Sequence, residues 1–186
     1  KLNRFSATTF EEFTIALKML KKEHQITSLI LDLRGNTGGY LDQAIKILNE
    51  FFHKNELLVY TKGNARKKEE YFADKFGIFK DGNLCVLINE GSASASEIVA
   101  GALQDQKRAI LLGETTFGKG SVQSIIPLKN RGAIRLTVSK YYLPSGKSIS
   151  EVGVIPDIRV EAEGEEFSIN TDTDNQLNYA IKLLIG

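Results

Sequence analysis

The stretch NEGSASASEIVAGALQDQKRAILLGETTFGKGSVQ, residues 89–123, decides the fold of this chain. It follows a short apolar run at Leu84–Ile88, whose length and β-branched residues predict a buried strand. Gly91 then breaks the strand, and apolar side chains recur at helical spacing farther along. The sequence therefore predicts a strand, a small-residue turn and a helix over Ala95–Lys107, with Ser94 at the turn.

The turn at Ser94 is a suitable place for a nucleophile. The first N–H groups of a helix have no partner within it and point beyond its end, where a negatively charged oxygen is favoured. Ser94 or a neighbouring serine can also cap the helix, with Glu97 three residues on. The predicted helix would carry the chain ~20 Å away from Ser94, and a strand over Ala109–Gly113 would bring it back by ~17 Å. This spacing is compatible with contact between Ser94 and Lys119.

Lys119 is the candidate base for Ser94. A lysine amine acts as a base only when it is neutral, and burial among apolar groups favours the neutral form. Gly118 and Gly120 flank the lysine, with Phe117 beside them, so its stem is expected to lie in such surroundings. A serine at a helix start is usually only a cap, and Gly-Lys-Gly is usually a solvated turn. The catalytic hypothesis therefore rests on the pair together with a second glycine loop.

That second loop lies in an earlier strand, loop and helix unit. Leu29–Leu33 predicts a buried strand, RGNTGG at residues 34–39 a glycine loop, and the apolar residues at 41–52 an amphipathic helix. Asp32 and Arg34 share one face of an extended strand, where they can pair and hold the loop. Because open α/β sheets build sites at the carboxyl ends of their strands, the two loops are expected to converge.

The convergence would supply hydrogen-bond donors for a developing oxyanion. Glycines let backbone N–H groups approach a substrate closely. One N–H from Gly38 or Gly39, together with that of Ala95, would form an oxyanion hole. The sequence does not distinguish the two glycines, and one of them can be a turn residue needed only for its positive φ.

Three ordered motifs carry a family resemblance: LDLRGNTGG at 31–39, SASASEIVAGALQD at 92–105 and GETTFGKGSVQ at 113–123. Together with the downstream YYLPSGKSI and GVIPDI, they resemble the C-terminal processing (tail-specific) serine peptidases, relatives of the tricorn protease core. The resemblance implies that Ser94 is the nucleophile, Lys119 the general base and Gln123 the glutamine that supports the lysine. It also matches Gly38, Gly39 and Ala95 to the oxyanion hole.

Asp105 matches the aspartate of the family's ALQD segment. It lies about three helical turns, ~16 Å, beyond Ser94 on the predicted helix, so it cannot orient the nucleophile directly. We expect a structural role near the end of the helix, with Lys107 or Arg108 as the ionic partner.

The implied fold is an α/β, crotonase/ClpP-like core of repeated strand-loop-helix units with a mixed β-sheet. The whole chain, 1–186, is expected to form a single peptidase core domain excised from a longer chain, without the PDZ domain that family members usually carry. Residues 161–166 are acidic and predict a surface linker before a C-terminal helix at 174–184.

The remaining segments predict further strands and one helix. They are a strand at Lys1–Ser6, a helix to about Lys22, a strand at Glu56–Lys62, a hairpin or loop excursion at 64–80, and a hairpin formed by Ser124–Leu128 and Ala133–Tyr142. Strands beside the site can receive an extended peptide substrate, since adding a strand to a sheet edge needs only main-chain hydrogen bonds.

Composition argues against several other classes of protein. A net charge of +1 gives no sign of nucleic-acid or membrane-surface binding. Cys85 is the only cysteine, which excludes an intrachain disulfide and favours a buried thiol. Neither His24 nor His53 has the spacing of a metal ligand, and no metal or other cofactor is implied. GETTFGK fits part of a P-loop, but Gly120 replaces the required Ser or Thr and a strand, not a helix, is predicted next.

The function predicted from the residues and the resemblance is that of a serine endopeptidase. It would cleave proteins near their C-termini by a Ser-Lys dyad, through an acyl-enzyme. The alternative is a non-catalytic peptide- or lipid-binding module of the same fold, against which the intact Ser94 and Lys119 argue. The resemblance alone implies an extracytoplasmic location, in the periplasm or cell envelope.

Overall fold

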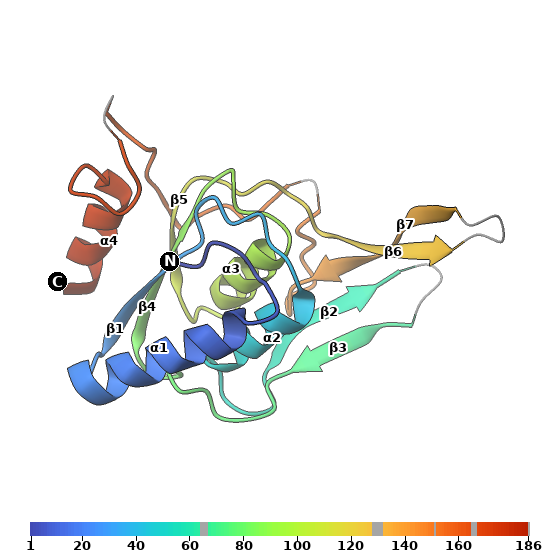
Figure 1. Cartoon of the computed structure of the whole chain (residues 1–186), viewed down its shortest axis with the longest axis horizontal. Helices are drawn as coiled ribbons and strands as arrows, with labels where there is room; N and C mark the ends of the chain where they lie inside the picture. Colours follow the sequence, from blue (N-terminus) through green and yellow to red (C-terminus); the bar gives the residue numbers. More distant parts are fainter. Residues whose placement is uncertain (64–66, 128–131, 151, 165–166, 186) are drawn as a thin grey trace.

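The structure is a computed structural model that describes residues 1–63, 67–127, 132–150, 152–164 and 167–185 (Figure 1). Its helices are α1 (Thr9–His24), α2 (Leu41–Asn49), α3 (Ala95–Asp105) and α4 (Asn175–Ile185). Its strands are β1 (Ser28–Asp32), β2 (Leu57–Lys62), β3 (Glu69–Phe72), β4 (Asn83–Ile88), β5 (Ile110–Gly113), β6 (Ser121–Pro127), β7 (Ala133–Tyr142) and β8 (Ile158–Arg159). Within the described residues, no helix is both long and apolar enough to cross a bilayer.

The strands form two sheets of different pairing. One is parallel, with the order β1-β4-β5-β8, and the other is antiparallel, with the order β3-β2-β7-β6. The predicted α/β fold with mixed pairing is confirmed, with the parallel and antiparallel pairs divided between two sheets. Because β1, β4 and β5 are parallel neighbours, the loops that follow them lie at one edge of their sheet.

Helices cover both faces of the parallel sheet, as the side chains of β4 show. Leu84, Val86 and Ile88 belong to the large core that includes side chains of α2 and α3. Cys85 and Leu87, which point to the other face, pack with Ala180 of α4. The strand is therefore buried on both sides, which explains its continuous apolar sequence.

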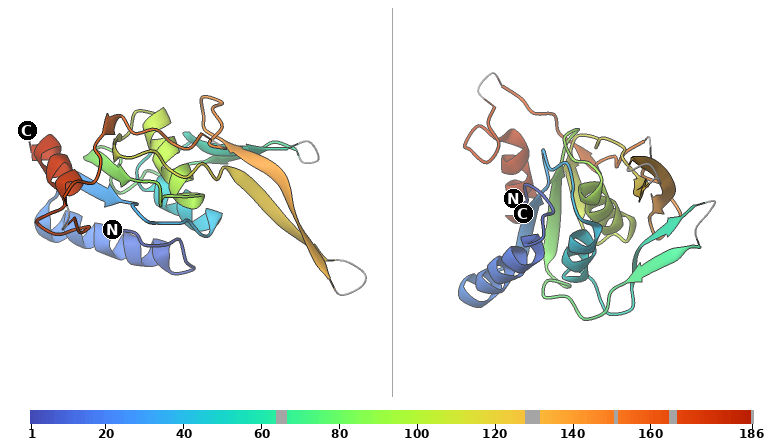
Figure 2. Two further views of the ribbon diagram at one scale, coloured as in Figure 1. Left: turned by 90° about the horizontal axis from the view of Figure 1, so that it is seen from above. Right: turned by 45° about the vertical axis from the view of Figure 1, so that its right-hand side comes forward.

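The antiparallel sheet extends away from this core. Figure 2 shows the β6–β7 hairpin projecting from the body on the side opposite α4. The predicted hairpin is confirmed, although part of its connection lies outside the described residues. The excursion predicted at 64–80 contains β3, which pairs with β2 as a second hairpin.

Two predicted elements differ in the structure. Lys1–Ser6 is not a strand. Within it, only Phe5 makes a β-bridge, and its partner Gly39 belongs to a loop and not to a strand. The helix predicted to end at Lys107 ends at Asp105, since Lys107 adopts a left-handed φ of 56° that no α-helix continues. The two-residue strand β8 is an addition that the sequence patterns do not predict.

Candidate active site

Ser94 lies at the sharp turn between β4 and α3, as the sequence predicts. Its φ of 57° and ψ of −115° are those of the first central residue of a type II′ turn, a conformation that glycine adopts far more readily than serine. Its backbone N–H donates to Oε2 of Glu97 at 2.8 Å, which is the reciprocal bond of a capping box. The half-buried serine is thus held at the N-terminus of α3 by its own backbone.

The loop after β1 packs directly on this turn. The carbonyl oxygen of Asn36 accepts the N–H of Ala93 at 3.0 Å and the hydroxyl of Ser96 at 2.7 Å. A Cβ added to Gly38 would lie 2.6 Å from the carbonyl oxygen of Ala93 and 2.9 Å from the backbone nitrogen of Ala95. The predicted convergence of the two loops is therefore present, and only glycine fits at 38.

The two glycines of this loop use their N–H groups differently. The N–H of Gly38 donates to Oδ1 of Asn36 at 2.9 Å. In the described part of the chain, the N–H groups of Gly39 and Ala95 have no hydrogen-bond partner. The unpaired N–H groups among these three residues are therefore those of Gly39 and Ala95, a distinction that sequence patterns do not make.

Glu97 joins the serine turn to the turn that carries Lys119. Its buried carboxylate accepts four hydrogen bonds from two segments of the chain. Oε1 binds the hydroxyl of Thr116 and the N–H of Gly118, each at 2.6 Å. Oε2 binds the N–H of Lys119 at 2.8 Å, in addition to that of Ser94. The backbone nitrogens of Ser94 and Lys119 consequently lie within about two hydrogen-bond lengths of each other.

The side chains of the lysine turn are not covered in this chain. Lys119 is exposed, and Phe117 is 69% exposed, so the expected burial of the lysine stem is not found. Glu97 binds Gly118 and Lys119 through their backbone N–H groups, which leaves the side chain of Lys119 at the surface. Gln123 lies exposed on β6, opposite Thr137 of β7, and no hydrogen bond joins it to Lys119.

Asp105 has a structural partner other than the predicted ones. Its carboxylate accepts the backbone N–H of Ser145 at 2.8 Å and the hydroxyl of that serine at 2.6 Å. It therefore ties the end of α3 to the turn after β7, and the predicted pairing with Lys107 or Arg108 is wrong. Arg108 instead donates to the carbonyl oxygens of Phe51 and Phe79, because the chain turns at Lys107 and leaves the helix.

Arg34, at the start of the glycine loop, makes the predicted pair with Asp32 and a second pair with Asp174. Burial alone would lower the pKa of Arg34, but its hydrogen bonds to Asp174 and Asp32 outweigh burial and raise the pKa. No sequence signal indicates the pairing with Asp174, which lies far along the chain.

For Glu97, the capping-box spacing is the available sequence signal, and it does not reveal the contact with the lysine turn.

The chain matches the model of Peptidase family S41 over residues 1–160. It is 48% identical over 165 residues to a carboxy-terminal-processing protease of Bartonella bacilliformis, covering 87% of this chain and 38% of that protein. The structure of the photosystem II D1 C-terminal processing protease matches with a TM-score of 0.83 and 32% identity, over 100% of this chain and 45% of that one.

The crystal structure of the tricorn protease also matches, with a TM-score of 0.50 over 86% of this chain and 15% of that one. At 22% identity this likeness concerns the fold alone. The chain spans less than half the length of each of these three proteins. The match of the family model over most of the residues nevertheless leads to one conclusion: the chain belongs to peptidase family S41.

Proposed function

We propose that the protein containing this chain is a serine endopeptidase that cleaves proteins near their C-termini, with Ser94 as nucleophile and Lys119 as general base. The observation that carries the proposal is the Glu97 carboxylate, which binds the backbone of both residues at 2.8 Å. A serine on a sharp strand-to-helix turn with a lysine turn beside it supports this assignment, because a nucleophile and its base must lie within reach of each other.

The proposed reaction proceeds through an acyl-enzyme. Neutral Lys119 takes the proton from the Ser94 hydroxyl as its oxygen attacks the scissile carbonyl carbon. The oxyanion accepts hydrogen bonds from the N–H groups of Gly39 and Ala95, which have no other partner in the described residues. The lysine then gives its proton to the leaving amine. In the second step, water attacks the ester carbonyl carbon while the lysine takes its proton, and the lysine returns that proton to the Ser94 oxygen as the ester bond breaks. Gln123 is proposed to support the lysine once substrate or further protein covers this surface.

The substrate is proposed to bind as an extended strand. β6 forms one edge of the antiparallel sheet, and it begins two residues after Lys119. An added strand there would receive main-chain hydrogen bonds whatever its sequence. We further propose that residues 1–186 form one peptidase core domain, that a PDZ domain elsewhere in the full protein captures substrate ends, and that the protein acts outside the cytoplasm.

The test is hydrolysis of an unstructured protein by the full protein, with product ends read by mass spectrometry. Ser94→Ala and Lys119→Ala are each expected to abolish cleavage, whereas Lys18→Ala, an exposed lysine of α1, is a matched control expected to leave it unchanged. The rate should rise with pH, because the base must be neutral.

Three results would contradict the proposal. They are cleavage that survives in both variants, a flat pH profile with chemistry rate-limiting, and peptide or lipid binding without cleavage by the full protein. The last of these would favour the non-catalytic module.

A further inference from the structure

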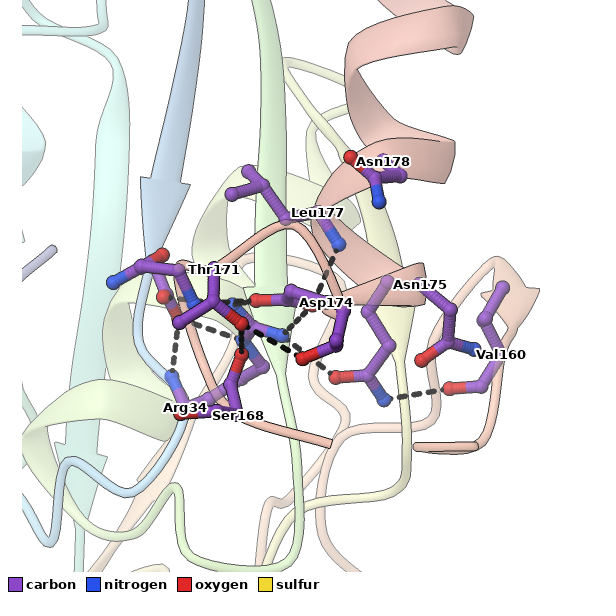
Figure 3. Close-up of polar contacts among 12 residues, drawn as sticks. Arg34, Val160, Ser168, Thr171, Asp174, Asn175, Leu177 and Asn178 are labelled. Atoms are coloured by element: carbon purple, nitrogen blue, oxygen red, sulfur yellow. Dashed lines mark hydrogen bonds and ion pairs between the residues drawn. The ribbon is translucent and has the colours of Figure 1, made fainter. Parts of the chain in front are cut away.

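A second buried polar cluster, separate from Glu97, surrounds the guanidinium of Arg34 (Figure 3). The side chain of Arg34 is fully buried and all five of its N–H donors are engaged. Nε and Nη2 donate to the two oxygens of Asp32, each at 3.0 Å. Nη1 and Nη2 donate to the two oxygens of Asp174 at 2.8 and 2.7 Å, and Nη1 also binds Gln176 at 2.9 Å. A guanidinium held by every donor has one orientation.

This cluster joins two segments that are far apart in the sequence. Asp174 stands immediately before α4, and its Oδ1 caps that helix by accepting the N–H of Leu177 at 2.9 Å. Its Oδ2 accepts the N–H of Asn170 at 2.7 Å. One carboxylate thus fixes both the start of α4 and the side chain of Arg34. It lies beyond the residues that match the family model.

Arg34 is also the first residue of the loop that packs on Ser94. Its own N–H donates to Oδ1 of Asp32 at 3.0 Å, so backbone and side chain are bound to the same cluster. Gly35 follows and donates to Oδ1 of Asn89 at 2.9 Å. Asn36 then contacts the serine turn, and Gly39 presents its N–H three residues later. A shift of Arg34 would therefore be transmitted along a short, tightly bonded segment.

We propose that Asp174 is a positioning residue for the oxyanion donor of Gly39. It acts through Arg34: the bidentate pair holds the start of the glycine loop and so sets the place of the Gly39 N–H relative to Ser94. Asp174 touches no substrate. The inference rests on the proposed function for its catalytic consequence, whereas the coupling between Asp174 and the loop is independent of it.

The variant Asp174→Asn separates this role from helix capping. Asparagine caps helices about as well as aspartate, so the bond to Leu177 is retained. The asparagine amide nitrogen, however, replaces Oδ2 by a donor that faces Nη2 of Arg34 and the N–H of Asn170, and the charge pair with Arg34 is lost. Ala180→Gly is the matched control, because it weakens α4 at a buried position without contact to Arg34.

Kinetics in the full protein give the first readout. Oxyanion contacts strengthen in the transition state, so Asp174→Asn is expected to lower kcat by about 10-fold or more while KM changes by less than about 2-fold. Ala180→Gly is expected to lower the urea midpoint of unfolding and to retain kcat. If kcat is unchanged in Asp174→Asn, or falls equally in both variants, the inference is wrong.

A second readout does not depend on cleavage. In ¹H–¹⁵N spectra, the amide peaks of Gly38 and Gly39 are expected to shift or broaden in Asp174→Asn and to stay in place in Ala180→Gly. Unchanged glycine peaks in Asp174→Asn overturn the inference. If the parent protein cleaves no faster than Ser94→Ala, the proposed function is contradicted. The spectra then still test the coupling between Asp174 and the glycine loop.

Discussion

Ser94 and Lys119 share one acceptor atom: Oε2 of Glu97 binds the backbone N–H of each at 2.8 Å. The other oxygen binds Thr116 and Gly118, so the buried carboxylate accepts four donors at once. An unprotonated carboxylate has about four acceptor positions, and all of them are used. The Glu97 side chain therefore links the two turns, as does the backbone bond from the N–H of Phe117 to the carbonyl oxygen of Ser92 at 3.1 Å.

Replacing Glu97 by glutamine should damage both stability and activity. The amide offers one oxygen in place of two and directs N–H groups at N–H groups, leaving buried donors without partners. We expect a loss of about 2–3 kcal/mol in the free energy of unfolding and at least about a 10-fold loss in the cleavage rate. Urea unfolding and hydrolysis of an unstructured protein measure the two effects.

The control for this change is Glu23→Gln, at an exposed position of α1, which should alter stability by less than about 0.5 kcal/mol. Equal behaviour of the two variants would show that the four hydrogen bonds of Glu97 do not hold the site together.

Alanine at Gly38 should be far more harmful than alanine at Gly35. Both glycines have positive φ, 97° and 70° respectively. A Cβ at Gly38 would press on Ala93 and Ala95, whereas a Cβ at Gly35 would meet nothing within 4 Å. Gly35→Ala therefore carries only the backbone penalty of about 1 kcal/mol, and Gly38→Ala adds a steric clash at the serine turn. Thermal unfolding together with cleavage assays distinguishes them, and similar losses in both would be inconsistent with the packing described.

Much of the fold is predictable because its pattern is local. The apolar run of β4 and the helical spacing in α1 and α3 place these elements within a few residues of their observed ends. The turn at Ser94 and the convergence of the two glycine loops follow from the same patterns and from parallel strand order.

Contacts between distant segments are not predictable in this way. Arg34 and Asp174 are 140 residues apart, and nothing in either local pattern indicates the other. The exposure of Lys119 is also not predictable from local sequence patterns, because it depends on which other parts of the protein cover the turn and not on the residues of the turn. The chemical roles of Ser94, Lys119, Gln123 and the oxyanion donors stay predictions that the proposed assays test.

The ion pair between Asp174 and Arg34 should make stability depend on pH. Burial would raise the pKa of Asp174, but the hydrogen bonds from Arg34 and from backbone N–H groups outweigh it, so the pKa is lowered. Its stabilising effect is therefore present above the unfolded value of about 4 and is lost as pH falls through the lower folded value. The difference in unfolding free energy between the parent and Asp174→Asn should be largest near neutral pH and shrink in acid. A difference that stays constant from pH 7 to pH 3 would contradict this account.

Cys85 should be unreactive in the folded protein. Burial in β4 beneath α4, with a contribution from the charge of Asp157, raises the pKa of its thiol to about 11. Since only the thiolate is nucleophilic, a disulfide reagent at pH 8 should modify the native chain at least about 100-fold more slowly than the urea-unfolded chain. Absorbance at increasing urea should follow the unfolding transition, and Cys85→Ala should give no signal. Rapid modification without denaturant would show that this face of the sheet opens readily.

The backbone at Ser94 is in a region that glycine occupies freely and that costs other residues on the order of 1–3 kcal/mol. A glycine at that position would therefore make the folded state more stable while removing the hydroxyl group. Folding therefore favours glycine at this position, whereas the proposed chemistry needs the hydroxyl group that only a strained residue supplies.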